Sequence, residues 1–242
     1  MAVSAVGVRV IGVGVVWTFA MSDSAYAKDV LVSADWVEDH LDDFQSDDSD
    51  HRLVEVDVDT EAYDDEHGVF AARFLVTALL YGHENLHLLN GDFSAWNQSH
   101  ETTSETPAVE PSTYEVREPT ASPLVDFETV RDALDTDAVI VDTREAWEYE
   151  EGHLPGAVQL DWRELVDAET RGLKPDDELE ALLTEREVTP DRRIVLYCNT
   201  ARRISHTYVV LKHLGYETVD FYEGSLTEWR ERGGRLVEGE AE

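Results

Sequence analysis

One stretch decides the fold of this chain: Ile194-Val195-Leu196-Tyr197-Cys198-Asn199-Thr200-Ala201-Arg202-Arg203. Its first four residues are apolar and rich in β-formers, which predicts a buried strand, and the pattern at residues 204–214 predicts a helix after the loop. Such a loop directs backbone N–H groups and the positive end of the helix dipole toward the residue at the strand end. That residue is Cys198, the only cysteine in the sequence. The setting favours its thiolate, which is the nucleophilic form.

Strands and helices alternate on both sides of this stretch. The pattern predicts strands at residues 138–141, 157–160 and 219–222, and helices at residues 146–151, 176–185 and 226–232. Alternation of this kind is typical of an α/β fold in which helices cover both faces of a parallel sheet.

A shorter copy of the same pattern lies in the first half. Gly82 matches Gly215 (215 − 82 = 133), and the same offset of 133 pairs Glu84 with Glu217, Gly91 with Gly224 and Trp96 with Trp229. Upstream, Glu61 matches Glu145 at an offset of only 84 (145 − 61 = 84). The first copy is therefore predicted to lack about 49 residues (133 − 84 = 49), including the reactive loop and the strand before it.

The repeat predicts four segments. Residues 1–29 form an N-terminal extension, 30–96 a truncated inactive copy, 97–123 a linker that carries four of the seven prolines, and 124–242 the catalytic domain. Residues 5–20 resemble a signal-peptide core, with 25–27 as a conceivable cleavage site, but Met21 is also a natural start for a soluble chain. We favour an over-extended start, and with it a cytoplasmic protein.

The charge of the chain is its compositional outlier. Acidic residues number 53 and basic residues 19, for a net charge of −34. A field of this sign repels nucleic acids and anionic membranes, so we expect neither as a partner. Charge spread along the whole chain is typical of a protein from a salt-loving organism, where concentrated salt screens the self-repulsion.

Four motifs identify a resemblance to a known family. They are Asp142-Thr143-Arg144, Gly152-His153-Leu154-Pro155-Gly156-Ala157, the loop that opens at Cys198, and Tyr222-Glu223-Gly224-Ser225 followed by Glu228-Trp229. In this order they resemble a rhodanese domain, and the whole chain resembles a tandem-rhodanese sulfurtransferase. The resemblance implies a rhodanese-like parallel sheet, preceded here by the truncated copy.

The resemblance implies a two-step sulfur transfer without a metal or an organic cofactor. Cys198 takes a sulfur atom from a small donor such as thiosulfate, holds it as a persulfide, and passes it to cyanide or to a thiol, including a thiol on a protein. The expected substrate-binding residues are Arg203, Arg202, Asn199, Thr200, Ala201, Asp142 and Arg144.

Two alternatives remain for the reactive loop. One is a persulfide carrier or redox sensor that does not turn over. The other is a phosphatase or arsenate reductase, but those relatives use Cys-x5-Arg, whereas here Ile204 is six residues beyond Cys198 and Arg203 is five beyond.

A His-Glu-x-x-His pattern at residues 83–87 is typical of zinc proteases only when it is helical. The repeat instead predicts a loop that enters a strand, where residues four apart are separated by about 13 Å, too far to share one zinc ion.

Overall fold

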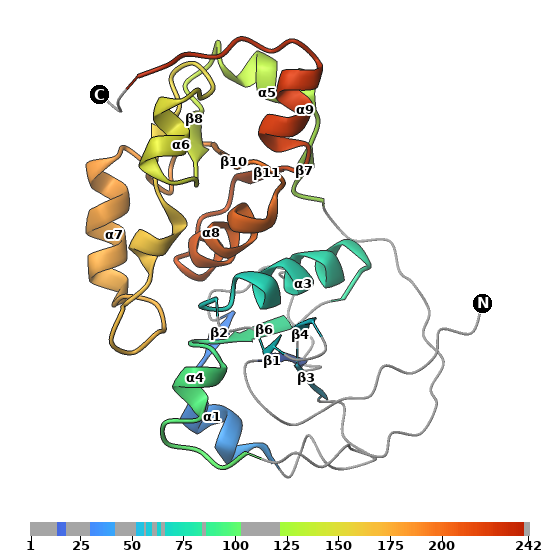
Figure 1. Cartoon of the computed structure of the whole chain (residues 1–242), viewed down its shortest axis with the longest axis vertical. Helices are drawn as coiled ribbons and strands as arrows, with labels where there is room; N and C mark the ends of the chain where they lie inside the picture. Colours follow the sequence, from blue (N-terminus) through green and yellow to red (C-terminus); the bar gives the residue numbers. More distant parts are fainter. Residues whose placement is uncertain are drawn as a thin grey trace, which may run out of the picture. The chain divides into compact units, whose positions relative to one another are not determined.

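The computed structural model describes residues 30–41, 66–83, 86–102 and 122–239, together with the strands at 14–17, 52–55, 57–59 and 62–63. The chain divides into two compact units (Figure 1). The first is Met1–Ser122 with Ala168–Gly172, and the second is Pro123–Asp167 with Leu173–Glu242. Within the described ranges, no helix has the length and apolar character needed to cross a membrane.

The second unit contains a five-stranded parallel sheet with the order β7-β11-β10-β8-β9. Its strands are β7 (Leu124–Val125), β8 (Val139–Asp142), β9 (Val158–Gln159), β10 (Ile194–Tyr197) and β11 (Val219–Tyr222). β10 is central, and its four residues are fully buried, as the apolar run predicts for a strand covered on both faces. The reactive loop therefore follows the most enclosed strand of the sheet.

Helices cover both faces of this sheet. Figure 1 shows α5 (Phe127–Ala133) and α9 (Ser225–Glu231) on one side and α8 (Arg202–His213) on the other. Val195 and Tyr197 pack in a core cluster with Phe127 and Trp229 of the first pair of helices, while Tyr208 of α8 meets Phe221 edge-on with ring centroids 5.8 Å apart. The predicted α/β class is confirmed.

Three further helical elements complete the second unit. They are α6 (Ala146–Glu150), the 3-10 turn η1 (Trp162–Leu165) and α7 (Asp176–Glu185). α7 has the predicted bounds, whereas α8 begins two residues before the predicted residue 204. α6 and η1 each begin with a capping box, in which a carboxylate three residues into the turn accepts a backbone N–H at its start.

The first unit contains a four-stranded sheet with the order β2-β6-β1-β3. Its strands are β1 (Gly14–Trp17), β2 (Leu31–Val32), β3 (Arg52–Glu55) and β6 (Leu86–Leu89), and a separate hairpin joins β4 (Asp57–Asp59) to β5 (Ala62–Tyr63). The described helices are α1 (Ala34–Asp39), α3 (Val69–Leu80) and α4 (Phe93–Trp96).

The internal repeat recurs in the bounds of these elements. α3 and β6 coincide with α8 and β11 at the offset of 133 (202 − 69 = 133; 219 − 86 = 133). The match includes the residue before each helix, since Gly68 and Ala201 both have left-handed φ angles, of 79° and 61°. The offset therefore runs further upstream than the sequence matches indicated, and it aligns Asp65, which lies outside the described residues, with Cys198. The truncation itself stays a prediction.

Strand β1 is a feature that the sequence analysis did not foresee. It lies between β6 and β3, as β10 lies between β11 and β8 in the second unit, but it is antiparallel to both neighbours. It comes from the segment assigned to an extension outside the copy. Its sequence, Gly-Val-Val-Trp, suits a strand, and a sheet without it would leave two rows of unpaired backbone groups.

Candidate active site

Cys198 follows β10 directly and is held by the start of α9. Its side chain is a free thiol, and the residue is 1% exposed. Its backbone N–H donates to Ser225 Oγ at 3.2 Å, and its carbonyl accepts from the N–H of Leu226 at 2.9 Å. Ser225 Oγ in turn donates to the carbonyl of Tyr222 at 2.9 Å. Cys198 therefore has both its backbone N–H and its carbonyl hydrogen-bonded, which limits the movement of this residue.

The loop that follows Cys198 has backbone N–H groups without a protein partner among the described residues. Within the described part of the chain, the N–H groups of Asn199, Thr200 and Ala201 donate to no protein acceptor. Ala201 is buried with φ of 61°, a conformation that costs a residue other than glycine about 1 kcal/mol. This turn precedes the 12-residue helix α8, whose positive end adds to the partial charge of the loop. Such a loop can bind an anion.

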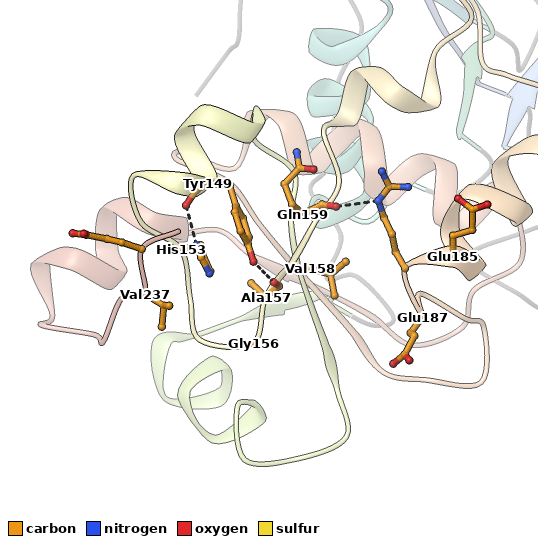
Figure 2. Close-up of a pocket in the computed structure, with 11 residues that line it drawn as sticks. Tyr149, His153, Gly156, Ala157, Val158, Gln159, Glu185, Glu187 and Val237 are labelled. Atoms are coloured by element: carbon orange, nitrogen blue, oxygen red, sulfur yellow. Dashed lines mark hydrogen bonds between the residues drawn. The ribbon is translucent and has the colours of Figure 1, made fainter. Parts of the chain in front are cut away.

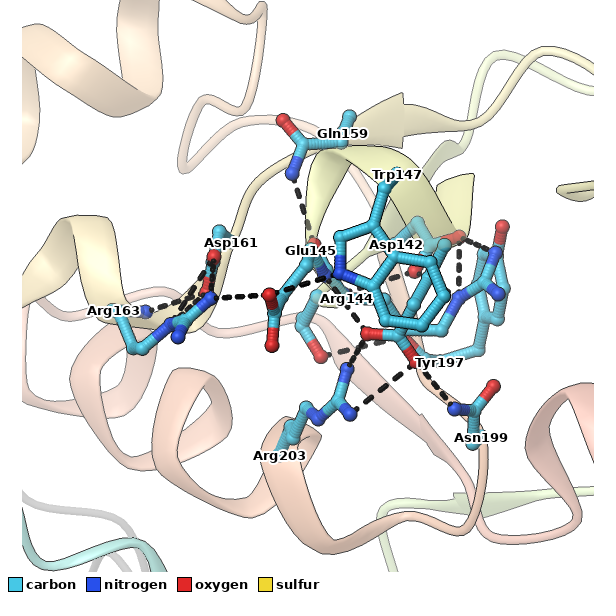
Figure 3. Close-up of polar contacts among 12 residues, drawn as sticks. Asp142, Arg144, Glu145, Trp147, Gln159, Asp161, Arg163, Tyr197, Asn199 and Arg203 are labelled. Carbon is cyan, nitrogen blue, oxygen red and sulfur yellow. Dashed lines mark hydrogen bonds and ion pairs between the residues drawn. The ribbon is translucent and has the colours of Figure 1, made fainter. Parts of the chain in front are cut away.

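A carboxylate from α6 holds the loop side chains, as Figure 3 shows for Asn199 and Arg203. Glu148 Oε1 accepts from Asn199 Nδ2 at 2.7 Å and from Arg203 Nη2 at 3.3 Å, and Oε2 pairs with Arg203 Nη1. The side chain of Glu148 is 8% exposed. Burial raises its pKa, but the bonds from Arg203, the backbone N–H of Glu145 and Asn199 outweigh burial and hold the pKa below its ordinary value.

Sequence reasoning did not place Glu148 or Ser225 among the site residues. A signal for Glu148 existed in the spacing of Glu145 and Glu148, which is that of a capping box, and Glu148 Oε2 accepts from the Glu145 N–H at 3.2 Å. That signal predicts the start of a helix but does not predict contact with a loop 51 residues away.

Among the predicted loop ligands, Thr200 and Arg202 are exposed, while Asn199 and Arg203 are half-buried against Glu148. The structure therefore brings all five predicted residues from Asn199 to Arg203 into one loop and helix start. It also shows that the guanidinium of Arg203 already has a carboxylate partner. The roles of these residues toward a substrate stay predictions.

Asp142 and Arg144 form a buried ion pair that contacts the turn at Gly152. Arg144 Nε donates to Asp142 at 2.9 and 3.0 Å, Nη2 donates to Asp142 Oδ2 at 2.6 Å, and Nη2 also donates to the Gly152 carbonyl at 2.8 Å. Burial lowers the pKa of Arg144, but the bonds to Asp142 raise it by more, so the pKa lies above its ordinary value. These contacts hold the turn at Gly152. A contact of the pair with a substrate stays a prediction.

An exposed rim lies beside this network in Figure 3. Trp147 is 56% exposed, and its Nε1 donates to Glu145 Oε2 at 3.0 Å. Glu145 also pairs with Arg163 at 3.1 Å, and Arg163 donates to both carboxylate oxygens of Asp161. Hydrogen bonds and ion pairs thus connect the exposed ring of Trp147 through Glu145 and Arg163 to Asp161.

A separate cavity of about 620 Å³ opens elsewhere in the second unit (Figure 2). Tyr149 and His153 stack in its wall with ring centroids 3.6 Å apart, and Tyr149 Oη donates to the Ala157 carbonyl at 2.6 Å. None of residues 198–203 lines it. The cavity therefore does not expose Cys198.

The described residues contain no group of three His, Cys, Asp or Glu side chains placed to hold a metal ion. His87 lies in strand β6, which confirms the strand predicted for the end of the His-Glu-x-x-His pattern. Glu84 and Asn85 lie outside the described residues.

Comparison with known proteins identifies the family to which this chain belongs. The model of the rhodanese-like domain matches residues 126–232. A Haloferax volcanii protein, provisionally named a thiosulfate sulfurtransferase, is 34% identical over 284 residues, covering 90% of this chain and 99% of that protein. This chain belongs to the rhodanese family. The alignment of 284 positions is longer than the 242 residues of this rhodanese, so it contains gaps.

Two further relatives are similar to this rhodanese. The thiosulfate sulfurtransferase of Azotobacter vinelandii is 35% identical over 184 residues, covering 69% of this chain and 65% of that protein. The sulfur carrier protein TtuD of Thermus thermophilus is 29% identical over 280 residues, covering 86% of this chain and 95% of that protein.

Solved structures support the fold. The anaerobic ergothioneine biosynthesis enzyme of Chlorobium limicola superposes with a TM-score of 0.64 and 18% identity over 76% of this chain. A persulfide form of EanB with ergothioneine superposes with a TM-score of 0.64 and 20% identity over 71%. This rhodanese spans 49% and 46% of those chains, and at such identities the likeness concerns the fold alone.

Proposed function

We propose that this rhodanese moves the outer sulfur of thiosulfate to cyanide or a thiol through a persulfide on Cys198. The observation that carries the proposal is the free thiol of Cys198 at the start of a loop whose next three N–H groups have no protein acceptor within the described residues. Membership of the rhodanese family and relatives named thiosulfate sulfurtransferase support it.

The cycle has two displacements at sulfur. The Cys198 thiolate attacks the outer sulfur of thiosulfate, a new S–S bond forms, and the original S–S bond breaks as sulfite leaves with its electron pair. Cyanide then attacks the terminal sulfur of the persulfide, so that thiocyanate forms and the thiolate returns. No external oxidant or reductant is needed, because the sulfur atom passes from one nucleophile to another.

The loop stabilises negative charge throughout this cycle. The N–H groups of Asn199, Thr200 and Ala201 hydrogen-bond the anionic sulfur and the sulfonate oxygens, and they are preorganised because Cys198 is bonded to Ser225 and Leu226. Arg202, exposed at the first position of α8, adds positive charge for the sulfonate. Arg203 is ion-paired with Glu148, and we place it at the edge of the site that binds the sulfur donor.

Thiocyanate release tests the proposal. Purified protein in multimolar KCl, supplied with thiosulfate and cyanide, is expected to release thiocyanate, and Cys198→Ser is expected to abolish the release. Thiosulfate alone should add the mass of one sulfur atom to the wild type and none to Cys198→Ser. Thiocyanate release that survives the substitution would exclude Cys198 as the sulfur carrier.

A persulfide carrier is the second candidate, favoured by the Thermus relative named as a sulfur carrier protein. In that case thiosulfate loads Cys198, cyanide turnover is absent, and a thiol-bearing protein accepts the sulfur. Turnover with cyanide favours the enzyme, whereas a stable persulfide without turnover favours the carrier. Hydrolysis of an aryl phosphate would instead support phosphatase chemistry, which the loop length disfavours.

The remaining proposals concern the location of the protein in the cell and its partners. We propose a cytoplasmic protein that acts on small sulfur donors and acceptors and binds neither nucleic acid nor membranes, because its net charge of −34 repels both.

A further inference from the structure

Glu148 is a buried carboxylate that contacts two side chains of the reactive loop. It reaches both the residue next to Cys198 and the arginine on the first turn of α8, through Asn199 Nδ2 at 2.7 Å and two guanidinium nitrogens of Arg203. The Glu145 N–H, at 3.2 Å, holds the same carboxylate from behind. Four donors therefore converge on one buried group.

These contacts change the charge that a sulfur donor such as thiosulfate meets at the loop. The side chains of Glu148 and Arg203 are 8% and 21% exposed, so the pair is shielded from salt and its charges cancel locally. The pair of Glu148 and Arg203 therefore adds no net charge to the loop. Cancellation removes attraction for an anion but leaves the backbone N–H groups able to bind uncharged sulfur compounds.

We propose that Glu148 determines donor specificity: by neutralising Arg203 while fixing Asn199, it weakens binding of small anionic donors relative to uncharged ones such as organic trisulfides. The proposal rests on the sulfur transfer assigned to Cys198 above. It makes Glu148 a specificity-determining and positioning residue that acts through Arg203 and not on the reacting sulfur.

Glu148→Gln tests the charge while retaining the shape. The amide oxygen can accept from Arg203 Nη1 and the Glu145 N–H, and the amide nitrogen can donate to the side-chain oxygen of Asn199 once the Asn199 amide has rotated by 180°. Only Arg203 Nη2, at 3.3 Å, loses its acceptor. Glu164→Gln is the matched control, because Glu164 is also a capping-box carboxylate bonded to an arginine, Arg186, at 2.7 Å, but it has no described contact with the loop.

With Glu148→Gln, the KM for thiosulfate is expected to fall by about three- to tenfold, the effect of one uncovered charge near the site. The kcat/KM for an uncharged organic trisulfide should change by less than about twofold. Glu164→Gln should change neither. An equal change for both donors, or no change for thiosulfate, would overturn the proposal.

Alkylation provides a readout that does not depend on sulfur transfer. Cys198 is the only cysteine, so its rates with anionic iodoacetate and neutral iodoacetamide can be measured in each variant at one KCl concentration. The rate ratio of iodoacetate to iodoacetamide should rise about three- to tenfold in Glu148→Gln. If no variant transfers sulfur, the proposed function fails, while this ratio still supports or overturns the role of Glu148.

Arg203→Gln and the double variant Glu148→Gln/Arg203→Gln complete the test. The single variant leaves the Glu148 charge without its partner, so the ratio should fall below that of the wild type. The double variant restores neutrality, and the ratio should return to within about twofold of the wild type. A double variant as low as Arg203→Gln would show that Arg203 binds the anion directly, and the proposal would be wrong.

Discussion

Substitution of Arg144 by methionine should destabilise the second unit strongly without touching the reactive loop. Arg144 and Asp142 are 2% and 0% exposed, and three hydrogen bonds join their side chains. Methionine fills much of the space but leaves the Asp142 carboxylate buried without its cation and the Gly152 carbonyl without its donor. Breaking such a pair from one side costs about 3–5 kcal/mol.

The double variant Asp142→Asn/Arg144→Met isolates the cause of this loss. Asparagine still accepts the backbone N–H of Arg144, which bonds to Asp142 Oδ1 at 3.0 Å, but it carries no charge to leave unpaired. The double variant should therefore recover most of the stability and remain about 1–2 kcal/mol below the wild type, because hydrogen bonds are still missing.

Urea unfolding at a fixed KCl concentration, followed by far-UV circular dichroism and tryptophan fluorescence, measures both values. A chain with two compact units can show two unfolding transitions, so the transition assigned to the second unit by limited proteolysis is the one to compare. A loss below about 1 kcal/mol in Arg144→Met, with an unchanged denaturant slope, would refute the reasoning. So would a double variant no more stable than the single one.

Four further predictions follow from single features. Ala201→Gly should raise unfolding free energy by about 1 kcal/mol, measured in urea, because glycine adopts the φ of 61° without strain. Ser225→Ala frees the Cys198 N–H, and kcat for thiocyanate formation should fall more than KM changes; an unaltered kcat would contradict the bond's positioning role. Removal of residues 1–20 takes away β1, so protease should digest the first unit while the second unit stays protected; equal protection of both units would contradict a stabilising role for β1. Because the pKa of Glu148 is lowered on folding, its ionisation stabilises the fold above about pH 4 and this gain is lost as pH falls; Glu148→Gln should therefore be less stable than wild type at neutral pH and match it in acid, as thermal melts across pH can show.

Local patterns in the sequence accounted for most elements of the second unit, but they did not predict β7, α5 or η1. β10 and α7 have the predicted bounds, and α8 begins within two residues of its predicted start, because burial on both faces of a strand and the amphipathic period of a helix are written in adjacent residues. The elements of the first unit were harder to predict. β1 could not be predicted from the repeat, because its antiparallel pairing with β6 and β3 has no counterpart in the second unit.

By itself the sequence determined the position of the single cysteine, the loop length and the parallel sheet around it, because each depends on residues close together in the chain. Only the tertiary structure decided which groups surround Cys198. Ser225 lies 27 residues from Cys198, and Glu148 lies 51 residues from Asn199. Contacts at such separations are set by how strands and helices pack, and no spacing in the sequence shows that Arg203 has a buried carboxylate as its partner.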